Sequence, residues 1–200
     1  MQRVRQRCMI GCVVAGVLLG GSPAWPAAEL VVYGFEGSLE GWGVPEWAAT
    51  SPDYVARQLV ASRGYASEGQ YALELLAAFP GGRWAGAYVE REAEVTDWTP
   101  FGRLSVDVYL PAGAPDGLRA RLILTVGTDW RWTEMRRAVP LTPGTWTTLT
   151  AHLVPGDRDW KVSSDDRFRA DVRKLGIRIE SDGAAPYRGS VFIDGVRVAD

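Results

Sequence analysis

The chain has 200 residues, of which 46% are hydrophobic and 23% charged, so it has room for one domain or one domain with a short appendage. The first 28 residues hold three of the 22 basic side chains and none of the 24 acidic ones, which leaves residues 29–200 with a net charge of −5. This acidic balance leaves no basic stripe to neutralise phosphates. It therefore excludes nucleic acid and anionic membranes as the expected partners.

The first 28 residues have the features of a secretory signal peptide. Arg3, Arg5 and Arg7 form a basic region, and the apolar run over 9–19 is short for a membrane-spanning helix. Small residues follow, with possible cleavage sites in SPA and PAA before residue 29. An uncleaved anchor is the alternative. We expect a secreted or periplasmic protein with no membrane span after signal cleavage.

Both cysteines, Cys8 and Cys12, lie in this leader. The segment MIGC resembles a lipoprotein box, but such a box ends the apolar run, and here the run continues to Leu19. Lipidation is therefore not expected. Residues 29–200 contain no thiol, so their stability has to come from the hydrophobic core or a bound ion.

Residues 29–200 show the alternation of a β protein and no linker, charge block or repeat, which predicts a single domain. Apolar residues at every second position between turn signals are typical of strands with one buried face. The expected strands are 30–35, 54–60, 71–77, 88–95, 104–110, 121–126, 135–141, 148–153, 175–180 and 190–198. One short helix is expected near 165–173. About ten short strands with almost no helix predict an all-β, antiparallel β-sandwich of two sheets packed face to face.

Four motifs follow one another along the predicted domain. VYGFEGSLEGW spans 32–42, ASEGQYAL spans 66–73, WTPFGRLSVDVYLP spans 98–111 and YRGSVFIDGVRV spans 187–198. In order and spacing they resemble jelly-roll carbohydrate-binding modules of the galactose-binding-like type, except that Asp194-Gly195 stands where Asp-Asn is common. The resemblance implies a jelly-roll β-sandwich that binds a polysaccharide or oligosaccharide.

In similar modules a structural calcium ion ties the first strand to the last. The resemblance places carboxylates at Glu36 and Asp194, and the turn at Glu68 and Gly69 could supply carbonyl oxygens. Calcium prefers such a set of oxygen ligands. The alternative is that Glu36 and Asp194 cap turns without a metal. An ion at this site would serve stability rather than chemistry.

The segment GTDWRWTEMRR places Trp130 and Trp132 among charged residues. If the alternation of residues 122–126 continued, both indoles would point into the core. A bulge or turn at 127–129 would turn them outward. Outward indoles would stack on the C–H face of a sugar ring, with Arg131 binding hydroxyl groups. Core packing is the simpler expectation for at least one of the two indoles.

Further aromatic residues complete the predicted carbohydrate site. Trp160 lies in the polar loop 155–161 and is expected to be exposed. Strand ends, where jelly-roll clefts usually open, carry Trp47, Trp84, Tyr88 and Tyr187.

Two polar strand faces could add hydrogen-bonding groups. Asp107 and Tyr109 share one outward face, and Arg178 and Glu180 share another. If both strands belonged to one sheet, they would form a concave polar surface with aromatic rims. The alternative is two solvated strand faces with cross-strand ion pairs.

The strongest enzymatic signal is the alternation of Glu90, Glu92 and Glu94, which an ideal strand would place on one face. The spacing is similar to the acidic strand of jelly-roll glucanases, in which two carboxylates flank the scissile bond. In those enzymes the middle acid is normally aspartate, and no aromatic cleft motif surrounds this strand. His152, the one histidine, lies on a polar strand face without a nucleophile motif. We therefore expect no catalytic residues.

The sequence as a whole predicts a secreted, monomeric, non-catalytic protein that binds a polysaccharide or oligosaccharide. Because similar modules usually accompany a catalytic domain, a separately encoded glycoside hydrolase or an envelope protein is the expected protein partner. One alternative is a structural or protein-interaction sandwich of the cell envelope without a sugar site. The other is a glucanase-like hydrolase, which requires Glu90 and a second acid to face each other across an open cleft.

Overall fold

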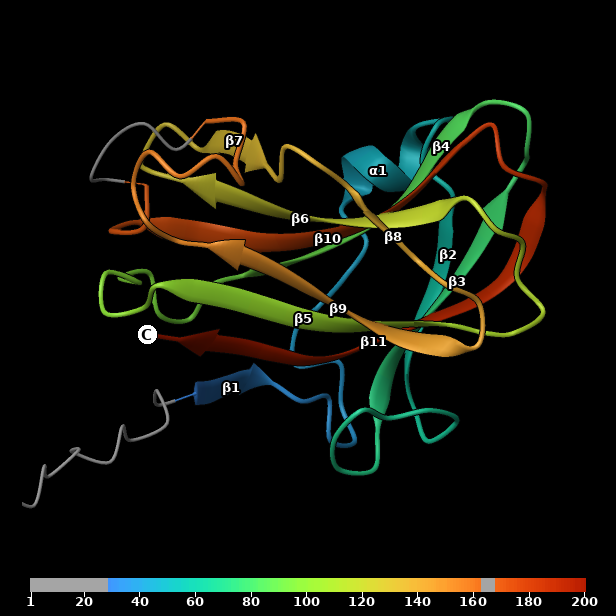
Figure 1. The fold of residues 1–200 in the computed structure, drawn as a ribbon, viewed down its shortest axis with the longest axis horizontal. Coiled ribbons are helices and arrows are strands. Elements are labelled where there is room, and N and C mark those ends of the chain that lie inside the picture. The colour runs from blue at the N-terminus through green and yellow to red at the C-terminus, as the bar shows by residue number, and fades with distance from the viewer. Residues whose placement is uncertain (1–28, 163–167) are drawn as a thin grey trace, which may run out of the picture.

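A computed structural model describes residues 29–162 and 168–200, which form two antiparallel β-sheets packed face to face (Figure 1). The six-stranded sheet has the order β2-β3-β11-β5-β9, with β1 also paired to β11. The five-stranded sheet has the order β4-β10-β6-β7, with β8 also paired to β6. This arrangement confirms the predicted jelly-roll β-sandwich.

The described residues contain eleven strands and one short helix, α1 (Glu46–Thr50). The strands are β1 (Glu29–Tyr33), β2 (Ala56–Ser62), β3 (Ala72–Phe79), β4 (Trp84–Glu92), β5 (Arg103–Leu110), β6 (Leu118–Val126), β7 (Arg131–Glu134), β8 (Val139–Pro140), β9 (Thr145–His152), β10 (Val172–Asp182) and β11 (Tyr187–Ala199).

Two expected elements differ from the structure. The strand expected over 135–141 is divided, because the Arg136 N–H donates to the Asp159 carbonyl at 2.6 Å and the chain bends there, away from β6. The prediction of a helix over 165–173 is wrong for residues 168–173, which the structure describes. Residues 168–171 form a turn and β10 follows, since Val172 N–H donates to Thr96 O at 2.8 Å rather than within a helix. Residues 165–167 lie outside the described residues.

The core lies between the two sheets and follows from the period-two pattern. In β10, Leu175, Ile177 and Ile179 point inward and are buried, and Leu122 and Leu124 of β6 lie beside them in register. Each such side chain contributes about 1.5–3 kcal/mol by leaving water. The alternate residues of the same strands point to the outer face of the five-stranded sheet, and this face carries the candidate site.

The segment that contains α1 crosses that outer face. Gly43 and Tyr54 form bridges to Glu90 and Gly86 of β4, at the edge of the five-stranded sheet. Between these bridges the chain folds over the sheet, where Ala48 of α1 is buried against Tyr88 and Ile123. Pro45, with φ −67°, starts the helix without needing an N–H donor, and extended backbone at Ser51 ends it.

Among the residues that the structure describes, no helix has the length and apolar character needed to cross a bilayer.

Candidate functional site

A cluster of aromatic side chains lies on the outer face of the five-stranded sheet. We call it the aromatic platform; it consists of Trp47, Tyr54, Trp84, Tyr88 and Trp132. Trp47 is central, with its ring centroid 5.0 Å from that of Tyr54 and 6.0 Å from that of Trp132. Tyr88 is fully buried, whereas Trp47 and Trp132 are 45% and 38% exposed. The platform therefore presents two open indoles on a packed aromatic base.

A turn decides the direction of the indoles at 130 and 132. Trp130 N–H donates to Gly127 O at 3.1 Å, and both residues have positive φ, 54° and 77°. After this turn, β7 pairs with β6 so that Trp132 lies opposite Thr125, on the outer face. Trp130 is 52% exposed, with the Lys174 ammonium 5.7 Å from its ring centroid. The expectation that at least one of these indoles packs in the core is therefore wrong, and the alternative of an outward turn is confirmed.

A network of ion pairs lies on the same face of the sheet. Arg178 Nη2 donates to Glu134 Oε2 at 2.8 Å, and its Nε donates to Glu180 Oε2 at 3.0 Å. Arg121 Nη2 reaches Glu180 Oε1 at 2.9 Å, and Lys161 pairs with Glu134. Arg178 also lies over the Trp84 ring, 5.6 Å from its centroid. These contacts fix the polar groups that adjoin the platform.

The network keeps its members charged. Burial favours the neutral form of Glu134, but Lys161, Arg178 and Arg121 outweigh it and hold the pKa of this carboxyl below its ordinary value. For Arg178, burial is likewise outweighed by Glu134 and Glu180, which raise its pKa. Charges that are paired in this way form a rigid wall of donors and acceptors.

Glu90 joins the buried base of the platform to β10. Its Oε2 accepts the Tyr88 hydroxyl at 3.0 Å and its Oε1 pairs with Lys174 Nζ at 2.6 Å. Burial and the neighbouring Glu90 carboxylate raise the pKa of Tyr88 far above its ordinary range, so its hydroxyl stays a donor. A cavity of about 180 Å³ adjoins this group, lined by Gly41, Gly43, Val44, Pro45, Glu90, Arg91, Glu92 and Lys174.

The three glutamates that suggested a glucanase do not form a row. β4 ends at Glu92, and Glu94, beyond the strand, pairs with Arg91 rather than pointing with Glu90. Glu90 is held by Lys174 and Tyr88 and its side chain is only 12% exposed. The arrangement does not place Glu90 and a second acid across an open cleft.

His152 is exposed, as expected for its strand face, and lies beside two aspartates. In the described part of the chain it is grouped with Asp157 and Asp159 as potential metal ligands. Its Nδ1 lies 2.9 Å from Asp159 Oδ2, and the same oxygen accepts the His152 backbone N–H at 2.9 Å. Hydrogen bonding that holds the loop to the end of β9 accounts for this contact.

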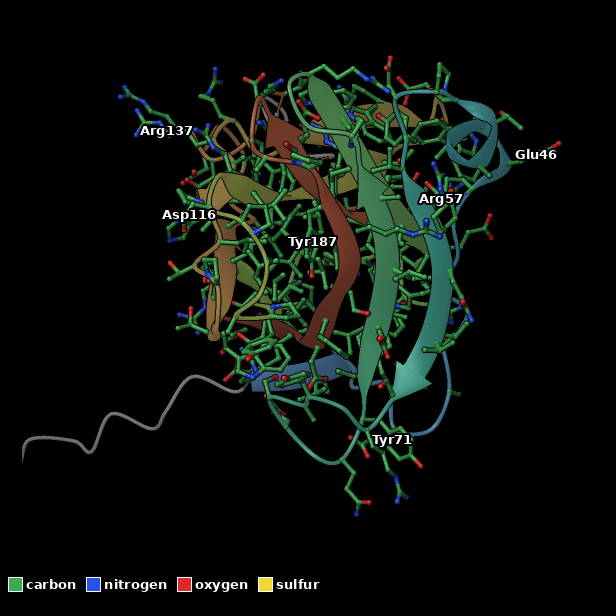
Figure 2. The ribbon with its side chains drawn as sticks, turned by 90° about the vertical axis from the view of Figure 1, so that its right-hand side faces the viewer. Glu46, Arg57, Tyr71, Asp116, Arg137 and Tyr187 are labelled. Atoms are coloured by element: carbon green, nitrogen blue, oxygen red, sulfur yellow. The ribbon has the colours of Figure 1, made fainter. Side chains whose placement is uncertain are left out.

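The structure does not place three of the predicted sugar-binding aromatic residues among the exposed side chains of the platform. Trp160 is fully buried rather than exposed, because the polar loop folds back and its Nε1–H donates to His152 O at 2.6 Å. Tyr88 is also buried, beneath Trp47. Tyr187 lies in the six-stranded sheet, packs against the core and donates its hydroxyl to Ser190 O at 2.9 Å, where burial raises its pKa (Figure 2).

The predicted polar surface is divided between the two sheets. β5, with Asp107 and Tyr109, belongs to the six-stranded sheet, whereas β10, with Arg178, belongs to the five-stranded sheet. The prediction that these strands form one concave polar surface is therefore wrong. Asp107 is buried and accepts a hydrogen bond from Thr148 Oγ1 at 2.6 Å. Tyr109 stacks on Tyr65, with ring centroids 4.3 Å apart, so the loop before β3 covers this face of the six-stranded sheet.

Arg131, which was expected to bind sugar hydroxyls, lies in β7 beside Trp132. Strand alternation points its side chain to the face opposite that of Trp132.

The residues expected to bind calcium accept hydrogen bonds from nearby turns. Glu36 Oε1 accepts Gln70 N–H at 2.9 Å, and Asp194 Oδ2 accepts Ser67 N–H at 2.7 Å and Glu68 N–H at 3.1 Å. Burial raises the pKa of Asp194, and these donors partly offset that effect. Gly69, with φ 60°, allows this cap, because a Cβ there would lie 2.6 Å from the Glu36 carboxyl carbon.

The side chain of Glu68 pairs with Arg197, whose guanidinium also reaches Asp107 at 2.9 Å. The expected calcium ligands thus accept hydrogen bonds from protein donors, which agrees with the alternative of capping carboxylates. From these contacts we expect the turns to be capped without an ion, and thermal unfolding with added calcium tests that expectation.

Several residues of the site could not be found from the sequence. Strand pairing brings three of them to the outer face of the five-stranded sheet: Tyr54, Glu134 and Lys174. Of these, Glu134 is two residues from Trp132 on the same strand, so strand alternation alone places both on one face. The sequence predicts a strand from Tyr54, but β2 begins at Ala56 and Tyr54 forms only an isolated bridge to Gly86. The sequence identifies Trp47 only as an aromatic residue near a strand end, whereas it lies in α1.

Comparison with known proteins bears on the fold. No protein-family model matches the sequence, and neither does any curated protein. A solved family 27 carbohydrate-binding module of Caldicellulosiruptor saccharolyticus, in complex with mannohexaose, is 17% identical, with a TM-score of 0.58 over 86% of this chain and 96% of that one. The family 11 module of a cellulosomal cellulase of Clostridium thermocellum is 12% identical, with a TM-score of 0.54 over 87% and 95% of the two chains.

A family 28 module described as specific for non-crystalline cellulose is 14% identical, with a TM-score of 0.58 over 82% of this chain and 90% of that one. At these identities the similarity concerns the fold, and it extends over most of each pair of chains. The resemblance expected from the four motifs is confirmed at this level. This chain has the jelly-roll β-sandwich fold of carbohydrate-binding modules.

Proposed function

We propose that this protein binds a polysaccharide or oligosaccharide on the aromatic platform and breaks no bond in it. The observation that carries the proposal is the pair of exposed indoles, Trp47 and Trp132, held 6.0 Å apart on the outer face of the five-stranded sheet. A pyranose ring has an apolar C–H face that an indole can cover, and fixed polar groups beside it orient the hydroxyls.

The ion-pair network of Arg178, Glu134 and Glu180 adjoins the platform as a largely buried wall, and Lys161, with its side chain 51% exposed, is the member most open to a sugar. Its members are ordered by one another, so binding a sugar costs little side-chain entropy at this wall. The solved structures with this fold support the same class of ligand, since one contains mannohexaose and another is described as specific for non-crystalline cellulose. Glu90 is occupied by Lys174 and the Tyr88 hydroxyl and does not face a second acid across a cleft, which supports binding of the glycan without hydrolysis.

Export of the chain suits this role. The leader-like residues 1–28 would take the domain to the compartment where polysaccharides occur. A separately encoded glycoside hydrolase or an envelope protein is the proposed protein partner, which the platform would bring to the glycan.

The test is a titration of residues 29–200 with soluble mannan, cellulose, xylan, mixed-linkage β-glucan and pectin oligosaccharides, followed by tryptophan fluorescence and calorimetry. We expect saturable binding of at least one glycan, weakened about tenfold or more in Trp47→Ala and in Trp132→Ala. The matched control is Trp146→Ala, which removes an indole of the six-stranded sheet whose ring centroid lies 5.4 Å from that of Tyr109.

Circular dichroism has to show that each variant is folded. If no glycan binds the folded protein, or if Trp146→Ala weakens binding as much as Trp132→Ala, the platform is not the binding site. The structural or protein-interaction sandwich would then be the better description of the protein.

A further inference from the structure

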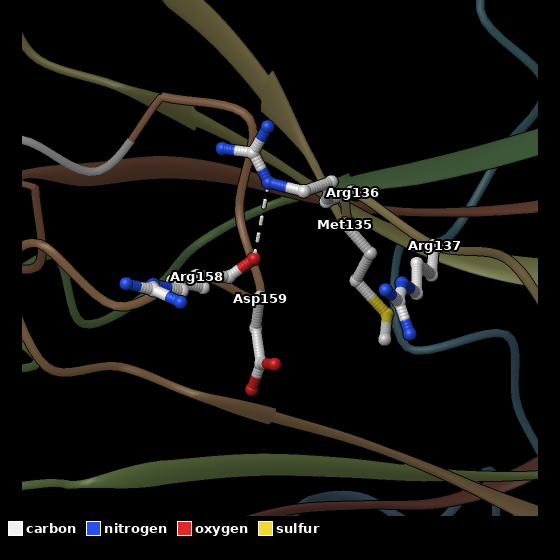
Figure 3. Close-up of a pocket in the computed structure, with 5 residues that line it drawn as sticks. All are labelled: Met135, Arg136, Arg137, Arg158 and Asp159. Atoms are coloured by element: carbon white, nitrogen blue, oxygen red, sulfur yellow. Dashed lines mark hydrogen bonds between the residues drawn. The ribbon is translucent and has the colours of Figure 1, made fainter.

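A second recess lies at the side of the sandwich, beyond the end of β7. It has a volume of about 490 Å³ and is lined by Met135, Arg136, Arg137, Arg158 and Asp159 (Figure 3). We call it the arginine pocket. Three of its lining side chains are guanidinium groups, although residues 29–200 as a whole carry a net charge of −5. Its volume is within the range of small-ligand sites.

The pocket is built rather than formed by loose surface side chains. Met135 is buried at its floor and forms a bridge to Trp160. The Arg136 guanidinium donates to Arg158 O at 3.2 Å and to Trp160 O at 3.1 Å. These bonds hold the loop over residues 155–162 against the end of β7 and fix the position of Arg136, and Figure 3 shows the bond to Arg158.

The positive charge of the pocket is not neutralised from within. Among the described residues Asp159 is the one acid that lines it, and its Oδ2 already accepts the His152 N–H and approaches Nδ1, each at 2.9 Å. Within residues 29–162 and 168–200, Arg137 and Arg158 form no ion pair. Figure 2 shows Arg137 projecting at the outer edge of the molecule.

A smaller recess extends the same cationic surface. It has a volume of about 230 Å³, shares Arg136 and Arg158 with the arginine pocket, and adds Asp157 and Lys161, of which Lys161 is paired with Glu134. Arg137 and Arg158 are therefore the groups most open to a ligand, and guanidinium groups favour a planar or tetrahedral anion, which they bind through paired N–H donors.

We propose that the arginine pocket binds an anionic substituent of the glycan, either the carboxylate of a uronic acid or a sulfate ester. This inference rests on the proposed function and specifies its substrate class as an acidic glycan. Trp132 lies in β7 and Arg136 lies at the bend that follows it, so they are four positions apart in the chain and their Cα atoms are at most about 13 Å apart. This distance is within the reach of one oligosaccharide that passes from the outer face of the sheet to the side of the sandwich.

The experiment uses pairs of probes that differ only in charge. Oligogalacturonate is compared with its methyl ester, glucuronate-branched xylo-oligosaccharides with unbranched ones, and dextran sulfate with dextran. The first two pairs test a carboxylate and the third tests a sulfate ester. We expect the wild-type protein to bind the charged member of at least one pair about tenfold more tightly, with a preference that falls as salt rises.

The test variant is the double substitution Arg137→Gln with Arg158→Gln, which leaves Arg136 and its structural hydrogen bonds in place. The matched control is Arg188→Gln, an exposed arginine on β11 of the six-stranded sheet. We expect the double variant to lose the preference for the charged probe and to keep its affinity for the neutral one, whereas the control keeps both.

The outcomes separate the two proposals. Binding of neutral glycans that depends on Trp132, with no preference for any charged probe, would retain the platform and overturn the arginine pocket. A preference that survives in the double variant would also overturn the pocket. Loss of neutral binding in the Arg137 and Arg158 variant would show that these residues support the fold, and would again contradict the proposal.

Discussion

Gly176 of β10 supports the buried base of the platform. The Tyr88 ring lies directly on it, and a Cβ at this position would lie 2.5 Å from Tyr88 Cε2 and 2.7 Å from Cζ. Glycine therefore lets the ring lie flat against the strand, and the flat ring in turn supports Trp47. The backbone at Gly176 needs no unusual φ, so the requirement is one of space alone.

Gly176→Ala should therefore force the Tyr88 ring away from β10. We expect the free energy of unfolding to fall by about 1–3 kcal/mol, the usual cost of an added methyl group in a packed region. Urea denaturation measures this change. Gly113→Ala is the matched control, because a Cβ there meets nothing within 4 Å. Equal stability of the two variants would contradict the tight contact.

At the scale of elements, Arg197 ties β11 to three other parts of the chain. Its guanidinium contacts Glu29 of β1 at 3.0 Å, Asp107 of β5 at 2.9 Å and Glu68 of the turn before β3. Burial disfavours its charge, but Glu68 and Asp107 outweigh that effect and raise its pKa. A fixed cation therefore lies beside Glu68, one of the residues expected to bind calcium.

Two results are expected from this arrangement. Adding calcium or a chelator should leave the Tm of the wild-type protein unchanged, because Arg197 already supplies the positive charge. Arg197→Gln should lower the free energy of unfolding by about 1–3 kcal/mol, since it leaves Asp107 buried without its partner. Thermal unfolding measures both effects, with Arg188→Gln as control. A clear rise in Tm with calcium would show that the ion binds after all.

Glu134 of β7 pairs with Arg121 of β6 and Arg178 of β10, and it makes the stability of the protein depend on pH. Because its folded-state pKa lies below the ordinary value of 4.5, its charge stabilises the folded protein above that pH. This contribution is lost as the pH falls below 4.5 and through the folded-state pKa. Urea denaturation at pH values between about 6 and 3 should show a smaller loss of stability in Glu134→Gln than in the wild-type protein.

The control for this pH series is Glu92→Gln, an exposed acid of the same sheet. It should follow the wild-type curve. If Glu134→Gln does so as well, the network does not depend on the charge of Glu134.

At the scale of the whole molecule, one continuous core joins the two sheets. It includes Val106 and Val108 of β5 on one side and Leu122 and Leu124 of β6 on the other. We expect residues 29–200 to unfold in a single transition that is the same by far-ultraviolet circular dichroism and by tryptophan fluorescence. Two separate transitions would contradict the prediction of a single domain.

The sequence predicted the sandwich well because its evidence is local. Alternation places apolar side chains on one face of a strand whatever the partner strand is, so each of the expected strands overlaps an observed one. Helix position was predicted poorly. The carbonyl groups of Arg169 and Asp171 accept hydrogen bonds from the distant residues Trp98 and Gly127, so this segment has no need of helical bonds. The observed helix α1 is stabilised by Ala48 packing on the sheet rather than by a long amphipathic pattern.

The candidate site depended on information that the sequence does not contain. Trp160 and Trp132 both lie among polar residues, yet one is buried and the other is exposed, because a folded-back loop and a turn decide their directions. Asp107 and Arg178 have the same alternating context, but strand order assigns them to different sheets. Local patterns constrain which side chains share a strand face, and they do not specify which strands become neighbours.

Hydrophobic period, turn chemistry and composition act over short stretches, so the sequence predicts an all-β chain with an acidic net charge, many aromatic side chains and the motif order of a jelly roll. The folded structure was needed to show that Trp47 lies beside Trp132, that Arg197 pairs with Glu68, one of the expected calcium ligands, and that Arg137 and Arg158 border one pocket. The physical reason is that these contacts join residues far apart in the chain. Their energies come from strand order and loop packing, which depend on the whole fold.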